Sequence, residues 1–122
     1  MNAYPARDSE PETRHCIVRM VGTAGPAAPT KLLGSDVTIT RDGVGVYTLT
    51  WASTPGAWVG PAGESFQATT SDDVKGCTVS WGVFNTTTRA VQFKVWDLAG
   101  NARELAALEW LTVDVMFKAT GG

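Results

Sequence analysis

The sequence predicts an all-β domain: an antiparallel β-sandwich, or jelly-roll-like barrel, of about seven strands. Two observations support this fold class. Several segments alternate between apolar and polar residues, as strands with one buried face do, and clusters of Gly, Pro, Asn and Asp separate them. A chain of 122 residues can bury a core as one domain without a disulfide or a metal. We expect a flexible arm at 1–15, a sandwich domain at 16–119 and a short tail at 120–122.

The clearest element is a β-hairpin at residues 37–51, in which apolar residues and threonines alternate on both sides of a turn. A three-residue turn, 43–45, would place Ile39 opposite Leu49 and keep all the apolar side chains on one face. It would also put Gly45 at the position that needs a left-handed backbone. The alternation therefore predicts both the hairpin and its register.

The remaining elements follow from the same patterns. Alternating or apolar runs predict further strands at 16–21, 65–70, 75–84, 89–97 and 110–119. Gly- and Pro-rich segments predict loops at 22–34 and 52–63. Asn101 followed by Glu104 resembles a helix start, so we expect at most one short helix near 102–108.

Composition excludes several partners. The net charge is −2 and no basic run occurs, which argues against nucleic acid. No apolar stretch is long enough to cross a membrane, and no signal-peptide pattern opens the chain. We therefore expect synthesis in a cytoplasm and, since export is not indicated, free thiols at Cys16 and Cys77.

The sequence offers no catalytic or metal-binding constellation. The chain has one histidine, His15, without a nucleophile in pattern, and no ligand spacing suggests a metal. The acids Asp72, Asp73, Glu104 and Glu109 are expected in turns or on a helix, not as the paired carboxylates of a glycosidase cleft. We expect no enzyme activity, no cofactor and no metal.

Five tryptophans are the unusual feature of the composition. Trp51 and Trp81 fall on apolar strand faces and are expected in the core. Trp96 and Trp110 are out of phase with the apolar sides of their strands, and Trp58 is expected in a loop. An outward tryptophan is either a platform for a sugar or an anchor in a protein interface.

The N-terminal arm has two interpretations. Residues 1–15 contain no Val, Ile, Leu, Phe or Trp and cannot bury enough surface to order themselves. The arm is then either a frayed end or a segment that becomes ordered on a neighbouring subunit. In the second case Tyr4 would be its anchor, and Arg7 and Arg14 would be further contacts.

The hairpin sequence VTITRDGVGVYTLT, residues 37–50, resembles that of small tailed-bacteriophage virion proteins. A later strand–loop–strand unit, a turn at 98–99 and an alternating strand at 111–118 follow in the same order, whereas the tryptophan-rich stretch 51–58 departs from the pattern. The resemblance is to β-sandwich head-decoration (cement) or fibre-associated proteins. It implies a homo-oligomer, often a trimer, that binds the major capsid protein on the outside of the assembled head. The alternative is a tail-fibre or head-spike component with a carbohydrate- or receptor-binding surface.

Overall fold

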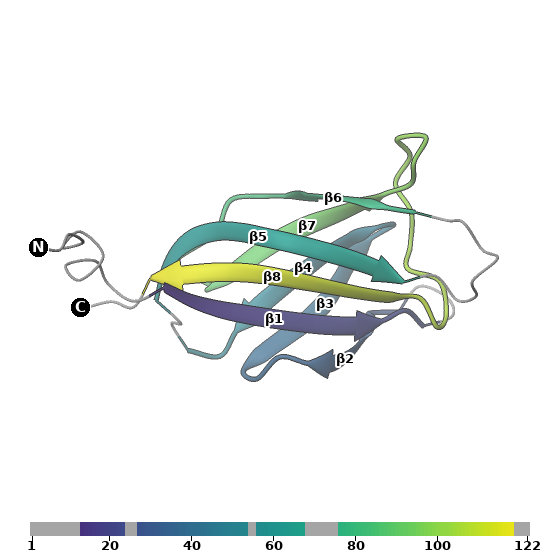
Figure 1. The fold of residues 1–122 in the computed structure, drawn as a ribbon. Coiled ribbons are helices and arrows are strands. Elements are labelled where there is room, and N and C mark those ends of the chain that lie inside the picture. The colour runs from purple at the N-terminus through teal and green to yellow at the C-terminus, as the bar shows by residue number, and fades with distance from the viewer. Residues whose placement is uncertain (1–12, 24–26, 54–55, 68–75, 119–122) are drawn as a thin grey trace, which may run out of the picture.

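The computed structural model describes residues 13–23, 27–53, 56–67 and 76–118, which form eight strands and no helix (Figure 1). The strands are β1 Thr13–Val21, β2 Thr30–Leu33, β3 Val37–Gly43, β4 Val46–Trp51, β5 Ala57–Gln67, β6 Thr78–Trp81, β7 Ala90–Trp96 and β8 Trp110–Lys118. They pair antiparallel in two four-stranded sheets, ordered β2-β1-β8-β5 and β3-β4-β7-β6. The predicted sandwich is confirmed, with one strand more than expected.

The β3–β4 hairpin has the predicted register from Val37 to Arg41, but its turn is shorter than the predicted 43–45. Ile39 lies opposite Leu49, and Gly45 has the left-handed backbone that the turn requires, with φ 67°. A register shift between Arg41 and Gly43 gives the hairpin a bulge beside its turn, so that Gly43 pairs with Val46. The apolar side chains of both strands consequently face the second sheet.

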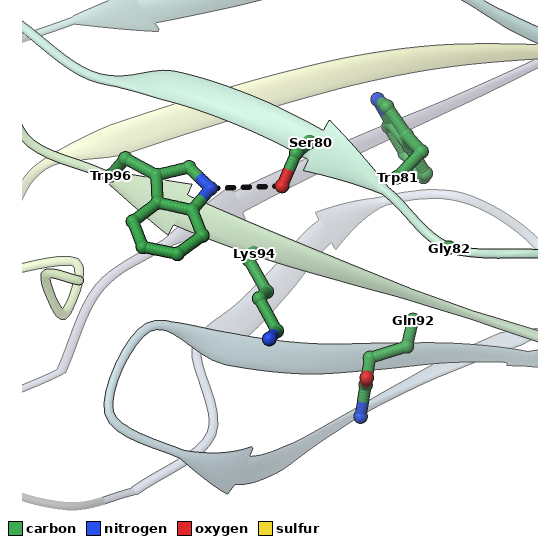
Figure 2. Close-up of a pocket in the computed structure, with 6 residues that line it drawn as sticks. All are labelled: Ser80, Trp81, Gly82, Gln92, Lys94 and Trp96. Atoms are coloured by element: carbon green, nitrogen blue, oxygen red, sulfur yellow. Dashed lines mark hydrogen bonds between the residues drawn. The ribbon is translucent and has the colours of Figure 1, made fainter. Parts of the chain in front are cut away.

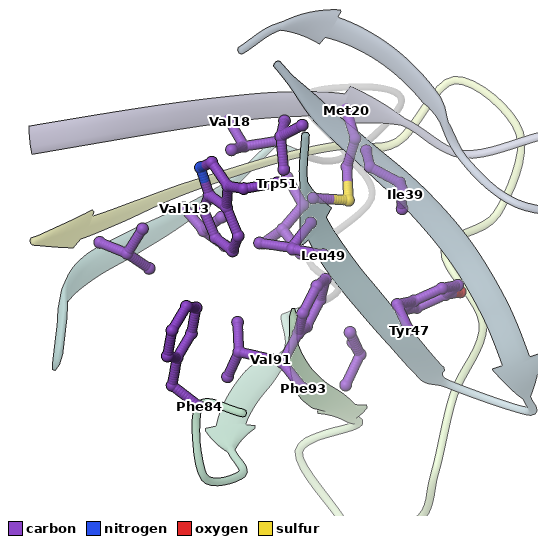
Figure 3. Packing of buried hydrophobic residues seen from close by; sticks show 14 of the residues in the cluster. Val18, Met20, Ile39, Tyr47, Leu49, Trp51, Phe84, Val91, Phe93 and Val113 are labelled. Atoms are coloured by element: carbon purple, nitrogen blue, oxygen red, sulfur yellow. The ribbon is translucent and has the colours of Figure 1, made fainter. Parts of the chain in front are cut away.

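The core lies between the two sheets and follows the alternation of the strands (Figure 3). Its most deeply buried members are Leu105 and residues of β1, β3, β4, β7 and β8: Val18, Met20, Val37, Tyr47, Leu49, Trp51, Val91, Phe93, Val95, Leu111, Val113, Val115 and Phe117. Trp51 is buried as expected, and Trp81 packs against the core with its ring 5.2 Å from that of Phe93. Val83, expected on the apolar face of its strand, is 92% exposed because β6 ends at Trp81.

The β2-β1-β8-β5 sheet is more extensive than predicted, and three of its strands include residues that were expected in the arm or in loops. β1 begins at Thr13, opposite Lys118, so the strand includes residues assigned to the arm. β2 lies inside the expected loop 22–34 and pairs with β1. β5 replaces most of the turn-rich connection expected at 52–63, because register shifts next to Trp58 and Pro61 admit its Gly and Pro residues. As an edge strand, β5 tolerates a proline.

At most one short helix was expected near 102–108, and the segment forms a loop without a helix. The Arg103 N–H donates to the carbonyl of Val95, 3.0 Å away, which attaches the loop to β7 instead of closing a helical turn. The Glu104 carboxylate accepts hydrogen bonds from the β3–β4 hairpin, and Leu108 adopts a left-handed backbone with φ 66°. Tertiary contacts therefore override the local helix pattern.

Candidate binding surfaces

One hollow lies on the outer face of the β3-β4-β7-β6 sheet, over β6 and β7 (Figure 2). Because Val91, Phe93 and Val95 face the core, the alternate β7 side chains face outward. We call this site the Trp96 hollow; it has a volume of about 360 Å³ and is lined by Ser80, Trp81, Gly82, Gln92, Lys94 and Trp96.

Small residues on and just after β6 create the Trp96 hollow. Ser80 of β6 lies directly opposite Lys94, and Gly82, the residue after β6, donates its N–H to the Gln92 carbonyl at 2.8 Å. Neither residue fills the space beside the long β7 side chains. The Trp96 Nε1–H donates to Ser80 Oγ at 2.8 Å, which fixes the edge of the indole ring. The Lys94 ammonium is 5.9 Å from the centre of that ring.

A second surface lies at the β2 edge of the other sheet. All four β2 residues are exposed, and three apolar side chains stand out: Leu33 is 54%, Leu32 47% and Ile17 44% exposed. We call the sheet edge that carries these three residues the β1–β2 surface; Leu32 and Leu33 are adjacent in β2 and therefore lie on opposite sides of this edge. Ile17 and Leu33 also line a hollow of about 280 Å³. Next to Ile17, His15 of β1 contacts Asp114 of β8, with 3.0 Å between the His15 Nδ1 and the Asp114 carboxylate.

Trp58, Trp96 and Trp110 were the tryptophans that the sequence offered as partner contacts. Of these three, Trp96 alone lines one of the two hollows described above. Trp58 packs on the core, stacked on Phe84 with ring centres 5.1 Å apart. Trp110 faces outward, but the Arg19 guanidinium lies 5.2 Å over its ring. These contacts leave neither Trp58 nor Trp110 as an open platform.

Of the three arm residues that were expected to contact a partner, the structure describes only Arg14. Arg14 is an exposed residue of β1, opposite Phe117, and therefore belongs to the sandwich and not to the arm. Tyr4 and Arg7 lie outside the described residues. Their assignment as partner contacts stays a prediction.

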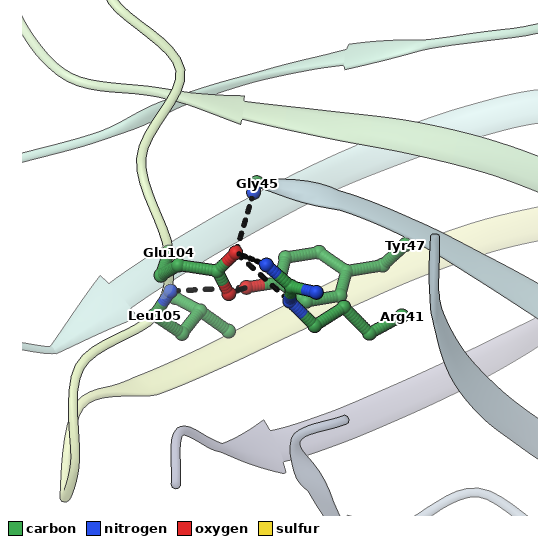
Figure 4. Close-up of polar contacts among 5 residues, drawn as sticks. All are labelled: Arg41, Gly45, Tyr47, Glu104 and Leu105. Carbon is green, nitrogen blue, oxygen red and sulfur yellow. Dashed lines mark hydrogen bonds and ion pairs between the residues drawn. The ribbon is translucent and has the colours of Figure 1, made fainter. Parts of the chain in front are cut away.

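A polar cluster around Glu104, which sequence reasoning missed, holds the 97–109 loop on the hairpin (Figure 4). The carboxylate accepts from Arg41 at 2.7 Å, from the Gly45 N–H at 3.1 Å and from the Tyr47 hydroxyl at 3.0 Å. The Tyr47 oxygen in turn accepts from the buried Leu105 N–H at 3.0 Å. The hydrogen bond from Arg41 holds the pKa of Glu104 below its usual value, and burial raises the pKa of Tyr47 to about 12.

Glu109, the second acid of this loop, also forms hydrogen bonds within the loop. Glu109 is buried and accepts two hydrogen bonds of 2.7 Å from Arg103 and one of 2.6 Å from the Ala106 N–H. Burying a carboxylate is costly unless its oxygens find partners of this kind. Both loop acids thus fasten the chain between β7 and β8, a role that their positions in the sequence do not reveal.

The described residues hold no group of three or more His, Cys, Asp or Glu placed to bind a metal ion. Cys16 and Cys77 are free, half-buried thiols, as expected, and burial raises the pKa of Cys77. Within the described part of the chain, no helix is long and apolar enough to cross a membrane.

No protein-family model, curated protein or solved structure matches the chain. The Trp96 hollow and the β1–β2 surface are therefore the features from which a function can be inferred. Sequence alternation alone could have placed Gln92, Lys94 and Trp96 on one outward face, whereas Ser80 joins them only through the pairing of β6 with β7.

Proposed function

We propose that this chain is a non-enzymatic bacteriophage virion protein of the head-decoration (cement) type. It binds the major capsid protein on the outside of the assembled head and associates with copies of itself, as a trimer. The observation that carries the proposal is the β1–β2 surface, where exposed apolar side chains lie on an edge strand. Such a strand offers both apolar area and unpaired backbone groups to another chain.

The β1–β2 surface is suited to association between copies. Leu32 and Leu33 are each about half exposed, and full burial of a leucine side chain contributes about 1.5 to 3 kcal/mol. Covering the exposed half of each would therefore contribute about 1 kcal/mol per side chain and per copy. Native edge strands usually carry charges or proline to prevent such contact. Lys31, the one charged residue of β2, instead donates to the Val37 carbonyl at 2.8 Å.

Decoration would stabilise the head by mass action. A protein that binds the assembled shell but not free capsid subunits shifts the equilibrium towards the shell by its binding free energy. A closed trimer multiplies this effect, since three copies then engage the shell together. The first and last strands of the described chain place Thr13 opposite Lys118, so both described ends leave the same end of the sandwich (Figure 1). A segment preceding Thr13 would reach the shell from that end.

Co-sedimentation with purified heads of the phage that encodes the chain tests this proposal. We expect saturable binding to assembled heads and none to unassembled capsid protein, with light scattering showing a trimer in solution. Leu33→Lys should give a monomer with reduced binding to heads, whereas Leu98→Lys, at a loop leucine that is 71% exposed, should change neither property. A native chain that stays monomeric, or that fails to sediment with heads, would overturn the proposal.

A further inference from the structure

We infer that the Trp96 hollow binds a carboxylated sugar residue, such as a uronic acid within a polysaccharide. This inference goes beyond capsid binding and concerns the opposite sheet. Three features of the hollow support it: an aromatic platform held in place, a cation without a carboxylate partner among the described residues, and short polar side chains around them.

The platform is the Trp96 indole. The C–H groups on one face of a pyranose ring pack against an aromatic face, and tryptophan offers the largest such area. The hydrogen bond from Nε1 to Ser80 holds the ring in one orientation before any ligand arrives. Preorganisation of this kind reduces the entropy cost of binding.

The cation is Lys94, and its surroundings favour an acidic ligand. Its neighbours across the sheet are Ser80 on β6 and Val46 on β4, both uncharged. The carboxylate of Asp42 reaches the edge of the hollow, where it accepts hydrogen bonds from the lining residue Gln92 and from Thr48 instead of pairing with Lys94. Within the described part of the chain no acidic side chain forms an ion pair with Lys94. A ligand carboxylate would supply the missing charge.

The contrast with Trp110 shows why Lys94 can serve a ligand. At Trp110 the covering Arg19 is fixed by a hydrogen bond from its Nε to Thr112 at 3.2 Å, and its guanidinium is 5.2 Å from the ring centre. Lys94 is 5.9 Å from the Trp96 ring centre, near the limit of a cation–π contact, and donates no hydrogen bond within the described residues. The lysine side chain can therefore turn towards a carboxylate without breaking another polar contact.

The size of the hollow limits the ligand. Its volume of about 360 Å³ is at the lower end of the range for small-molecule sites, about 300 to 1,000 Å³. One sugar residue fits such a space, and the open sheet face allows the polymer to continue in both directions. Gln92 and Ser80 flank the hollow. Gln92 donates to Asp42 and Ser80 accepts from Trp96, which leaves the Gln92 side-chain carbonyl as an acceptor and the Ser80 O–H as a donor for the hydroxyl groups of the sugar.

Isothermal titration calorimetry with alginate oligosaccharides, which are polyuronates, and with neutral dextran oligosaccharides tests the inference. We expect the native chain to bind the polyuronate at least tenfold more tightly than the neutral sugar. Lys94→Gln should reduce polyuronate affinity about tenfold, because it removes one charge-assisted hydrogen bond, and should leave dextran binding unchanged. Lys118→Gln, at an exposed lysine on the other sheet, is the matched control and should have no effect.

Trp96→Ala should abolish binding of both sugars, and Trp96→Phe, which keeps a ring, should retain part of it. Thermal melting of each variant separates loss of the platform from loss of the fold. The inference is wrong if the native chain binds no polyuronate, if it binds dextran equally well, or if Lys94→Gln and Trp96→Phe both bind like the native chain. Equal binding of a polyglutamate peptide would also overturn it. Co-sedimentation with heads tests the opposite sheet, so the two results are independent.

Discussion

Replacing Tyr47 by phenylalanine tests whether the Glu104 cluster holds the 97–109 loop on the hairpin. The Tyr47 side chain is 1% exposed, and its hydroxyl both donates to Glu104 and accepts from the Leu105 N–H, each at 3.0 Å. Because burial raises the pKa of this hydroxyl to about 12, it remains a donor throughout the neutral range. Phenylalanine keeps the ring beside Phe93, 5.6 Å away, so that the change removes the polar contacts and little packing.

The magnitude follows from the two lost contacts. The Leu105 N–H would be buried without an acceptor, which costs about 1 to 3 kcal/mol, and one hydrogen bond to a carboxylate would be lost as well. Together these effects should lower the free energy of unfolding by about 2 to 4 kcal/mol. For a chain of 122 residues, 1 kcal/mol corresponds to about 4 °C, so Tm should fall by about 8 to 16 °C.

Urea denaturation and calorimetry measure this loss directly. Thr48→Val is the matched control: it removes a hydroxyl from the adjacent residue of β4, on the outer face, and should cost less than about 1 kcal/mol. A double-mutant cycle with Glu104→Gln should show coupling between the two positions. If Tyr47→Phe loses less than about 0.5 kcal/mol, the cluster does not hold the loop and the explanation for the missing helix is wrong.

Three further predictions concern acid stability, the core and the N-terminal segment. The hydrogen bond from Arg41 holds the pKa of Glu104 below its usual value, so its ionised form stabilises the fold at neutral pH, and this contribution is lost as the pH falls through the folded pKa. Glu104→Gln should therefore flatten the decline of Tm as the pH falls below the usual pKa of a glutamate, and an unchanged slope would contradict the assignment. Phe93→Asp would bury an unpaired carboxylate at a fully buried position, so calorimetry should show no cooperative transition; a soluble variant that melts cooperatively would refute the face assignment. Deletion of residues 1–12 removes nothing from the described sandwich and should leave Tm unchanged while abolishing sedimentation with heads; full binding would exclude the segment from the interface.

The strand faces and the β3–β4 hairpin could be predicted from local sequence patterns. Alternation with a period of two is a local property of a strand, so it can be read without knowing the partner strand. For that reason the burial of Phe93 and Leu111, and the pairing of Ile39 with Leu49, agree with the sequence prediction. The left-handed Gly45 is equally local, because the turn length alone requires it.

Features that depend on a distant partner could not be predicted in this way. β5 is a strand despite its Gly and Pro residues because β8 supplies its hydrogen bonds and two register shifts absorb the irregular residues. Glu104, which resembles part of a helix cap in the sequence, is instead bound by Arg41 and Tyr47, whose positions precede it by more than fifty residues. The Trp96 hollow likewise exists only because β6 places Ser80 beside β7. Hydrogen bonds and packing between distant segments outweigh local propensity, and no local pattern encodes them.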